Sequence, residues 1–320
     1  MNRSITTNTH NPRIAYGEAL LELAAQNPNV VALDADLCKS TMSALVEGKY
    51  PERFFEMGIA EQNMAATAAG LALGGKIPFI HSFAVFVSGR AYDQIRQAIC
   101  TTRLNVKIVG SSAGLSDFGD GATHQSVEDV ALMRALPGMT VLSPCDALEV
   151  KKAVWAMAEF EGPVYLRLSR NDVPLLTRAE TPFEIGKIQP MRAGADLAIF
   201  ATGTMVATAL EAARQLEKFD VSAKVVNVAT LKPLDEPGVR RESDGMQGVI
   251  TVEEHSVIGG LGTAVLETLG ASRIPVQRVG IQDQFGMSAT NHLELLEYYG
   301  LTPGGVVAAA RSLMPNTVAS

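Results

Sequence analysis

One acidic residue, Glu61, stands in a segment that is otherwise made mostly of small and apolar residues. Residues 60–73 read Ala-Glu-Gln-Asn-Met-Ala-Ala-Thr-Ala-Ala-Gly-Leu-Ala-Leu. A buried carboxylate costs free energy unless it is paired or protonated, so a carboxylate in such surroundings points to proton transfer. The alternative is an ordinary acid in the first turn of a helix, where the helix dipole favours negative charge. This segment alone leaves both interpretations open.

A second set of chemically capable residues lies in the polar stretch 114–125. Asp120 and His124 are four residues apart after a predicted strand. A carboxylate and an imidazole at this spacing can point at one substrate and serve as acid and base. The alternative is a structural histidine, but we expect the pair to take part in catalysis.

The string Gly119-Asp120-Gly121 also matches the opening of the motif with which thiamine enzymes bind a metal ion and a diphosphate. That motif requires an asparagine further along the chain, and residues 146–152, which have the required spacing, contain none. We therefore reject a diphosphate site here. The five histidines show no metal-ligand spacing, so we expect no metal site in this chain.

A possible anion site involves two arginines, a lysine and a serine. Arginine binds phosphate through two hydrogen bonds, and a serine hydroxyl can complete the cradle. From the residues alone, they could equally be unrelated surface groups. The residues concerned are Arg13, Lys39, Ser40 and Arg170.

The string Gly259-Gly260-Leu261-Gly262 before a predicted helix resembles a dinucleotide-binding turn. It lacks the full Gly-x-Gly-x-x-Gly pattern, so close packing at a helix entry explains it better. His255, which follows two glutamates, is interpreted as a structural loop histidine.

Composition limits the class of protein. The 320 residues suffice for two domains, and 47% of them are hydrophobic, so the chain can bury a sizeable core. The net charge of -7 argues against nucleic acid as the main partner. No apolar run reaches the length of a membrane span, and the polar start is not a signal peptide. Cys38, Cys100 and Cys145 form no CxxC pair and are expected to be reduced, as in a cytoplasmic protein.

Short apolar runs alternate with helical segments, which is typical of α/β folds with parallel strands. The predicted strands are 30–33, 77–81, 106–110, 140–143, 164–168, 197–201, 224–228, 249–252 and 276–279. The predicted helices are 16–26, 59–73, 90–101, 127–135, 147–159, 206–216 and 262–269. Pro174, Pro182 and Pro190 interrupt the pattern between residues 171 and 194. We therefore place a linker at 176–192, between a first domain at 1–175 and a second at 193–320.

Taken in order, several strings resemble the thiamine diphosphate-dependent transketolase family. The resemblance implies a pyrimidine-binding domain of the thiamine-diphosphate fold with a mainly parallel sheet, followed by a smaller α/β transketolase C-terminal domain. It extends from about Arg13 to Leu313. The strings are Asp34-Ala35-Asp36-Leu37, Met57-Gly58-Ile59-Ala60-Glu61-Gln62-Asn63, Ser82-Phe83-Ala84-Val85-Phe86, Asp120-Gly121-Ala122-Thr123-His124-Gln125, Leu166-Arg167-Leu168-Ser169-Arg170, Leu231-Lys232-Pro233-Leu234-Asp235 and Thr251-Val252-Glu253-Glu254.

The resemblance also implies a partner. Transketolases have a further domain that binds the diphosphate and the metal ion of the cofactor, and the resemblance does not include it. We therefore expect the second subunit of a split transketolase, with an N-terminal subunit supplied by another polypeptide and an α₂β₂ heterotetramer as the assembly. The implied cofactor is thiamine diphosphate, with its pyrimidine end bound here and Mg²⁺ or Ca²⁺ held mainly by the partner.

By the same resemblance, Glu61 would share a proton with a ring nitrogen of the aminopyrimidine and so help to form the nucleophilic carbon of the cofactor. Phe83 and Phe86 would form an aromatic wall against that ring. The other residues that the resemblance places at the cofactor are Asp36, Leu37 and Arg90.

The resemblance further implies that Asp120 and His124 contact the hydroxyls and the carbonyl oxygen of the sugar. The distal phosphate of the substrate would be held by Arg13, Ser40 and Arg170. Typical transketolases add a histidine to this phosphate site, and counting back places that position at or near Ser112. The departure leaves three possibilities open, which are a phosphate that is held differently, another anion, or a branched sugar.

The implied reaction is transfer of a two-carbon ketol unit from a ketose, which we expect to be phosphorylated, to an aldose. One alternative is the β subunit of a 2-oxo acid dehydrogenase E1 component, which has the same plan and a comparable glutamate. The string 120–124, which resembles sugar-handling residues, argues against it. Another alternative is a non-catalytic regulatory or scaffold subunit, and the joint presence of Glu61, Asp120 and His124 argues against that.

Overall fold

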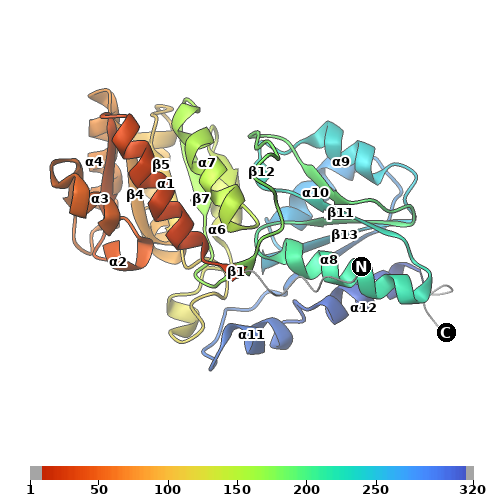
Figure 1. The fold of residues 1–320 in the computed structure, drawn as a ribbon. Coiled ribbons are helices and arrows are strands. Elements are labelled where there is room, and N and C mark those ends of the chain that lie inside the picture. The colour runs from red at the N-terminus through yellow and green to blue at the C-terminus, as the bar shows by residue number, and fades with distance from the viewer. Residues whose placement is uncertain (1–8, 315–320) are drawn as a thin grey trace.

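Two large β-sheets organise the chain (Figure 1), and a third sheet has only two strands; the computed structural model describes residues 9–314. The strands are β1 (Thr9–His10), β2 (Val30–Asp34), β3 (Phe54–Glu56), β4 (Ile77–Phe83), β5 (Lys107–Ser111), β6 (Thr140–Leu142), β7 (Val164–Arg167), β8 (Val173–Pro174), β9 (Gln189–Arg192), β10 (Leu197–Ala201), β11 (Ala223–Asn227), β12 (Thr230–Lys232), β13 (Gly248–Ser256) and β14 (Val276–Ile281). The α-helices are α1 (Pro12–Gln26), α2 (Cys38–Thr41), α3 (Ala44–Lys49), α4 (Glu61–Leu73), α5 (Tyr92–Gln94), α6 (Asp129–Ala135), α7 (Ala147–Glu159), α8 (Met205–Leu216), α9 (Glu236–Ser243), α10 (Leu261–Leu269), α11 (His292–Tyr298) and α12 (Pro303–Leu313). Three 3₁₀ turns are η2 (Pro51–Arg53), η5 (Gly121–Thr123) and η6 (Glu217–Phe219), and two π-helical turns are η3 (Phe86–Arg90) and η4 (Ile95–Cys100).

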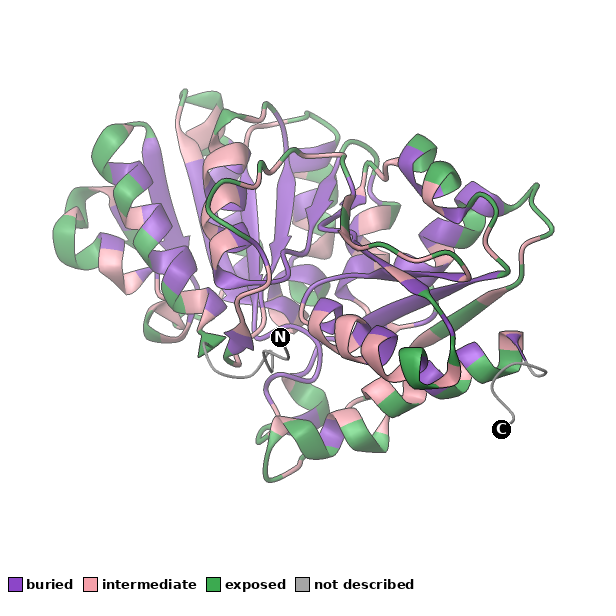
Figure 2. Ribbon diagram, turned by 45° about the vertical axis from the view of Figure 1, so that its right-hand side comes forward, coloured by how far each residue is buried: buried purple, intermediate pink, exposed green. Residues whose placement is uncertain are grey.

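Both sheets are mainly parallel, which confirms the predicted α/β class. The larger sheet has seven strands in the order β12-β6-β7-β5-β4-β2-β3, and β2 to β7 pair in parallel. The smaller sheet has five strands in the order β14-β13-β10-β11-β9, with β9 antiparallel to its neighbour. Every residue of β2, β5 and β10 is buried, as expected for strands covered by helices on both faces. The buried strands fill the middle of each half in Figure 2.

The element predictions were most accurate where apolar runs were long. All nine predicted strands exist, with ends that shift by a few residues. The helix predicted at 90–101 differs, because the helical segment begins earlier, at Ala84, and contains the two π-helical turns. A π-helical turn fits an additional residue into a helix, and residue type does not reveal it.

Strand β12 was not predicted, and it connects the two halves. It comes from the second half of the sequence but pairs antiparallel with β6 at the edge of the larger sheet, with Thr230 opposite Leu142. The Lys232 ammonium then donates to the carbonyl oxygens of Arg134 and Leu136, at 2.7 and 2.5 Å. One hydrophobic core also runs through both halves, with Met133 on one side and Phe200 on the other. The halves therefore fold against each other as one continuous body.

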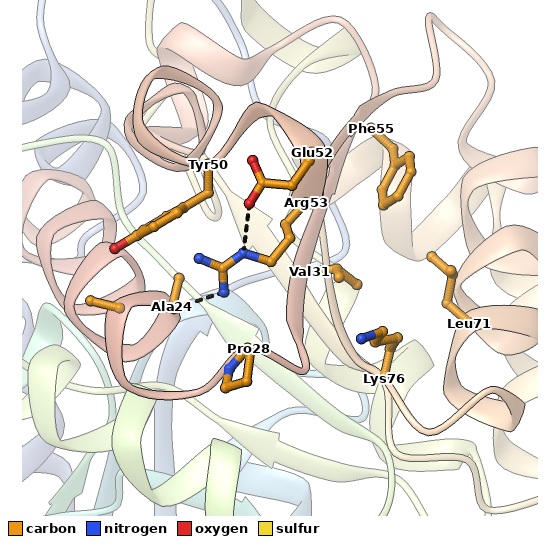
Figure 3. Close-up of a pocket in the computed structure, with 10 residues that line it drawn as sticks. Ala24, Pro28, Val31, Tyr50, Glu52, Arg53, Phe55, Leu71 and Lys76 are labelled. Atoms are coloured by element: carbon orange, nitrogen blue, oxygen red, sulfur yellow. Dashed lines mark hydrogen bonds and ion pairs between the residues drawn. The ribbon is translucent and has the colours of Figure 1, made fainter.

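A cavity of about 420 Å³ lies at the opposite edge of the larger sheet, beside β3 (Figure 3). Arg53 lines this cavity, and its guanidinium lies 4.0 Å from the centre of the Tyr50 ring. That guanidinium donates to the carbonyl oxygens of Ala24 and Asn27, at 2.8 and 3.3 Å. These carbonyls belong to the C-terminal end of α1, where helix carbonyls lack internal partners. Arg53 therefore closes the end of a helix, and its charge is already engaged.

Candidate active site

The strand order places the candidate residues beside the carboxyl ends of the strands of the larger sheet. After β2 the chain continues to β3 on one side, and after β4 it continues to β5 on the other side. Parallel sheets bind ligands beside the carboxyl ends of strands where the connections diverge in this way. The last residues of β2, β3, β4, β5 and β7 and the segments that follow these strands carry all the candidates except Arg13.

Glu61 is the first residue of α4, and its side chain is only 1% exposed. Its carboxylate accepts hydrogen bonds from Arg90 Nη1 at 2.8 Å to Oε1 and 2.7 Å to Oε2. The Ser82 hydroxyl lies 3.3 Å from Oε1. Glu61 thus lies in the first turn of a helix, as the alternative interpretation expected, and is also buried, as the first expected.

The aromatic side chains predicted at the cofactor lie next to this ion pair. Phe83, at the end of β4, stacks on Phe86 with the ring centres 6.1 Å apart and the planes at 12°. The Arg90 guanidinium lies 4.8 Å from the centre of the Phe86 ring. His124 approaches Phe86 edge-on at 5.3 Å and Phe83 at 6.3 Å, and its Nδ1 lies 2.9 Å from the Thr123 hydroxyl. We call Glu61, Phe83, Phe86, Arg90 and His124 the Glu61 cluster.

Two arginines that are far apart in sequence are brought together by Asn11. Its side-chain oxygen caps α1 by accepting from the backbone N–H of Arg13 at 3.0 Å, and Pro12 occupies the first helical position, where proline is favoured. Its side-chain amide donates to the Arg170 carbonyl at 3.1 Å and to Asp172 Oδ1 at 2.9 Å. Arg13 Nη1 donates to the backbone carbonyl of Ser40 at 2.8 Å.

Two carboxyl groups also belong to this group of residues. Arg170 Nη1 donates to both oxygens of Asp117, each at 2.9 Å. Burial raises the pKa of Asp117; the Arg170 charge opposes this, whereas the charge and hydrogen bonding of Asp120 add to it. Burial, followed by repulsion from Arg170, lowers the pKa of Arg13. We call Arg13, Ser40, Asp117, Asp120 and Arg170 the Arg170 cluster.

Asp120 and His124 flank a single 3₁₀ turn, η5, and belong to different clusters. Asp120 precedes the turn and contacts Asp117, whereas His124 follows it and contacts the phenylalanines. Gly121 within the turn has a φ of 74°, and a Cβ there would collide with Ser288. The tight turn therefore needs glycine and joins the two clusters.

The second half of the chain holds this loop in place. The backbone N–H of Ala289 donates to the Phe118 carbonyl at 2.9 Å, and the Gln125 amide donates to the Met287 carbonyl at 3.0 Å. The Glu254 carboxylate accepts from the Leu115 N–H at 2.7 Å. Glu254 also accepts from the Thr204 hydroxyl at 2.9 Å and lies 3.0 Å from His292 Nε2. Sequence reasoning assigned no role to Glu254, although it lies in one of the strings of the resemblance.

Asp34 organises the loop that follows β2. Its buried carboxylate accepts from the Leu37 N–H at 2.7 Å, the Thr41 hydroxyl at 2.6 Å and the Ser43 hydroxyl at 2.8 Å. Burial raises the pKa of Asp34 to about 6, against the effect of these hydrogen bonds. The exposed Asp36 has a φ of 62°, and its N–H donates to the carboxylate of Glu56 at 2.8 Å. Asp36 and Leu37 are thus fixed by neighbouring carboxylates, and their predicted contact with the cofactor stays a prediction.

Ser112 lies in the left-handed region with a φ of 52° and is fully buried. Its hydroxyl has no hydrogen-bond partner among the residues that the structure describes. Its predicted contact with substrate stays a prediction, and the side chain brings no charge to the Arg170 cluster.

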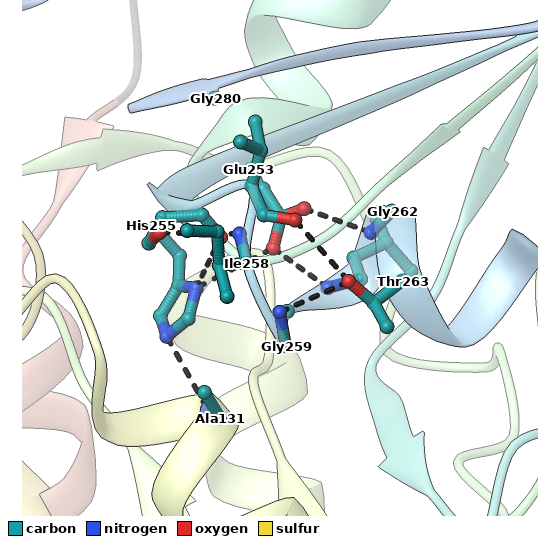
Figure 4. Close-up of polar contacts among 12 residues, drawn as sticks. Ala131, Glu253, His255, Ile258, Gly259, Gly262, Thr263 and Gly280 are labelled. Carbon is teal, nitrogen blue, oxygen red and sulfur yellow. Dashed lines mark hydrogen bonds and ion pairs between the residues drawn. The ribbon is translucent and has the colours of Figure 1, made fainter. Parts of the chain in front are cut away.

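The glycine turn before α10 already holds a carboxyl group of this chain (Figure 4). The buried Glu253 carboxylate accepts from the N–H of Leu261 at 2.6 Å and of Gly262 at 2.8 Å. A dinucleotide phosphate would need these same N–H groups. Burial lowers the pKa of the nearby His255 to about 4, and its Nδ1 bonds the Ser256 carbonyl at 2.7 Å, so it is a neutral structural histidine.

Within residues 9–314, no three His, Cys, Asp or Glu side chains are grouped closely enough to bind a metal ion. Over the same range, no helix combines the length and the apolar character that crossing a membrane requires.

Comparisons with known proteins agree with this arrangement. A protein of Methanocaldococcus jannaschii that is named as a transketolase C-terminal section is 46% identical over 293 residues, which cover 90% of this chain and 92% of that protein. The 6-deoxy-6-sulfo-D-fructose transketolase subunit SqwH of Clostridium sp. strain MSTE9 is 43% identical over 303 residues and 94% of each chain. A solved structure described as "Split gene transketolase, inactive beta4 tetramer" has a TM-score of 0.88 and 47% identity, and covers 97% of this chain and 100% of that chain.

Two family descriptions match almost the whole chain. "Transketolase, pyrimidine binding domain" matches residues 9–174, the part that carries both clusters. "Transketolase, C-terminal domain" matches residues 186–306, the part that holds the loop of Asp117 and His124 in place. The chain therefore belongs to the transketolase family and is similar, over nearly its whole length, to the C-terminal sections of its split members.

Proposed function

We propose that this chain is the pyrimidine-binding subunit of a thiamine diphosphate-dependent transketolase, which transfers a two-carbon ketol unit from a ketose to an aldose. The observation that carries the proposal is the buried Glu61 carboxylate beside two stacked phenylalanine rings and a histidine. The name of the Clostridium relative, a sugar transketolase subunit, supports ketose chemistry.

The residues present fit the pyrimidine end of thiamine diphosphate. Glu61 provides a carboxylate, which is shielded from water, for a ring nitrogen, and Phe86 provides a flat apolar surface for the ring. When bound, the cofactor supplies the nucleophilic carbon that attacks a ketose carbonyl. We expect Asp36 and Leu37, in the loop fixed by Asp34, to contact it as well.

The residues of this chain would then hold and move protons at stated atoms. Glu61 would share a proton with the ring nitrogen through Oε1 or Oε2, the atoms that now accept from Arg90. Arg90 would have to release at least one of these oxygens first. His124, edge-on to Phe86, would hydrogen-bond the substrate oxygens at the reacting carbon, and Asp120 would accept from a sugar hydroxyl.

We further propose that a partner subunit supplies the diphosphate-binding half and Mg²⁺ or Ca²⁺, in an α₂β₂ heterotetramer. The matched solved structure is described as an inactive β4 tetramer of a split transketolase, which supports a need for a second polypeptide. The domain limits proposed for this chain are 1–175 and 193–320, with the linker at 176–192.

The test is reconstitution with the N-terminal transketolase subunit from the same source. The complex should transfer a ketol unit from ketoses to aldoses and should not decarboxylate 2-oxo acids, whereas the opposite result would favour an E1 β subunit. Glu61→Gln should lower turnover about 10²- to 10⁴-fold, the range for a proton-transfer group. The matched control is Glu22→Gln on the exposed face of α1, which should leave turnover unchanged. A complex whose turnover survives Glu61→Gln would favour a scaffold role.

A further inference from the structure

The Arg170 cluster was predicted to hold a phosphate, but its strongest hydrogen-bond donor is already neutralised. Asp117 is 3% exposed and receives both of its short contacts from the same nitrogen of Arg170. The Arg170 backbone is fixed as well, because its N–H donates to the Ser116 hydroxyl at 3.2 Å. Asp117 thus places a carboxyl group of the chain itself beside Arg170, where the resemblance predicts the phosphate of the substrate.

The charges around these groups do not favour a dianion. Arg13 and Arg170 contribute two positive charges. Asp117 faces both guanidinium groups, Asp172 faces Arg13, and Asp120 lies beside Asp117. The carboxyl groups of Asp117 and Asp172 are thus enough to balance both positive charges. A phosphate monoester carries about -1.5 to -2 at neutral pH. Placing it beside Asp117 would juxtapose like charges, which disfavours binding.

Donors nevertheless remain for a less charged group. The Nε of Arg13 is buried and has no hydrogen-bond partner among the residues that the structure describes. Arg170 is 38% exposed, and a guanidinium has five N–H groups, of which Asp117 engages only those on Nη1. The cluster can thus hydrogen-bond a hydroxyl or a single negative charge without displacing Asp117.

We propose that Asp117 is a specificity-determining residue that restricts the substrates to sugars whose distal end carries at most one negative charge. This inference rests on the proposed function, whose substrate class it narrows. It replaces the phosphorylated ketose expected from the sequence with a neutral or singly charged one.

The experiment uses three ketoses that differ only at carbon 6, with one aldose acceptor and the reconstituted complex. They are D-fructose 6-phosphate, 6-deoxy-6-sulfo-D-fructose and D-fructose. At pH 7.5, the better of the sulfonate and the neutral sugar should exceed the phosphate in kcat/KM by about tenfold or more, which is about 1.4 kcal/mol. The phosphate should regain activity relative to the sulfonate toward pH 5.5, because its second ionisation lies near pH 6 and the sulfonate does not titrate.

Asp117→Asn tests the residue itself, since it removes the charge and nearly keeps the shape. In this variant, the ratio of kcat/KM for the sulfonate or the neutral sugar to that for the phosphate should fall by about tenfold or more, because the like charge has been removed. Asp172→Asn is the matched control, because this exposed residue also faces Arg13 but makes no contact with the Arg170 side chain. Because its charge is exposed and screened by solvent, its ratios should change much less than those of Asp117→Asn. Should Asp117→Asn fail to fold, Asp117→Ser and the pH series of the wild type decide instead.

The outcomes separate this inference from the proposed function. Ketol transfer with phosphate preferred, or an equal shift in the Asp172→Asn control, overturns the role of Asp117 and leaves the transketolase assignment intact. Failure to transfer from any ketose, together with decarboxylation of 2-oxo acids, overturns the proposed function itself.

Discussion

Arg90 engages both carboxylate oxygens of Glu61 through a single nitrogen, at 2.8 and 2.7 Å. Arg90 is the last residue of the π-helical turn η3, and Glu61 is the first residue of helix α4. Glu61 is buried, whereas the Arg90 side chain is 38% exposed. The pair therefore has one fixed member and one member that can move.

Arg90→Ala should destabilise the isolated chain by about 1–2 kcal/mol. Breaking a fully buried pair costs about 3–5 kcal/mol, but water can partly replace an exposed guanidinium. Urea unfolding at neutral pH measures this loss. Arg96→Ala, at an exposed position of the same helical segment, is the control and should change stability by less than about 0.5 kcal/mol. In the Glu61→Gln background, Arg90→Ala should cost much less; an undiminished cost would mean that the pair does not couple the two residues.

Asp34→Asn should loosen the loop that carries Asp36, Leu37 and Ser40. An amide nitrogen cannot accept a hydrogen bond, so at least one donor loses its partner, at about 1–3 kcal/mol. Faster amide exchange at residues 35–43 would show this directly. Asp93→Asn on the exposed face of α5 removes the same charge and should leave exchange unchanged.

The fold was predictable from the sequence because the central strands are apolar on both faces and the helices between them are regular. Glu61 and His124 were also foreseeable from the residues, since Glu61 stands out in an apolar segment and His124 follows a predicted strand. Local patterns of this kind predict which residues are buried and which residues follow the end of a strand. The family resemblance, rather than a local pattern, indicated Phe83, Phe86 and Arg90.

The partners of charged groups were not predictable. The grouping of Arg13 and Arg170 was predicted, but Asp117 lies among similar polar residues, and its contact with Arg170 was not. The same holds for β12, a three-residue strand whose pairing depends on a contact across 88 positions between Thr230 and Leu142. Such relationships arise from tertiary packing, which sequence periodicity does not encode.

The contact between His292 and Glu254 should make stability depend on pH. Although burial alone disfavours the charged ring, the Glu254 carboxylate raises the pKa of His292. Burial likewise opposes the charge of Glu254, but His292 and the other donors lower its pKa. The histidine contribution is complete below its unfolded pKa, about 6.5, and is lost as the pH rises through the raised value. The glutamate contribution is present above about 4.3 and is lost as the pH falls through the lowered value.

His292→Gln keeps a hydrogen-bond donor but removes this charge. Its melting temperature should fall below that of the wild type most between about pH 4.5 and 6.5, and the gap should close above pH 8. A gap that stays constant across the whole range would exclude a charged pair.

Glu253 should produce the opposite kind of slope from an ordinary carboxylate. Burial raises its pKa to about 7, against the effect of the N–H groups of Gly262 and Leu261. Between about pH 4.3 and 7, the folded chain then binds a proton that the unfolded chain does not, so stability falls as the pH rises. The full effect is of the order of 3 kcal/mol.

In Glu253→Gln this component disappears, so the stability of the variant relative to the wild type should improve from pH 5 to pH 8. Thermal unfolding across this range measures the difference. Parallel curves for the two proteins would show that Glu253 keeps an ordinary pKa.

Strand β12 has a practical consequence for anyone who divides the gene. A truncated product that stops in the stretch 176–192 lacks Thr230–Lys232. The backbone groups of Val141 and Leu142 that pair with this strand are then unpaired and exposed to solvent. Bare edges recruit strands from other molecules, and such a fragment is expected to accumulate as inclusion bodies. Hybrid enzymes made by exchanging modules with a relative should therefore carry residues 228–234 together with the first module, either by circular permutation or by a grafted hairpin.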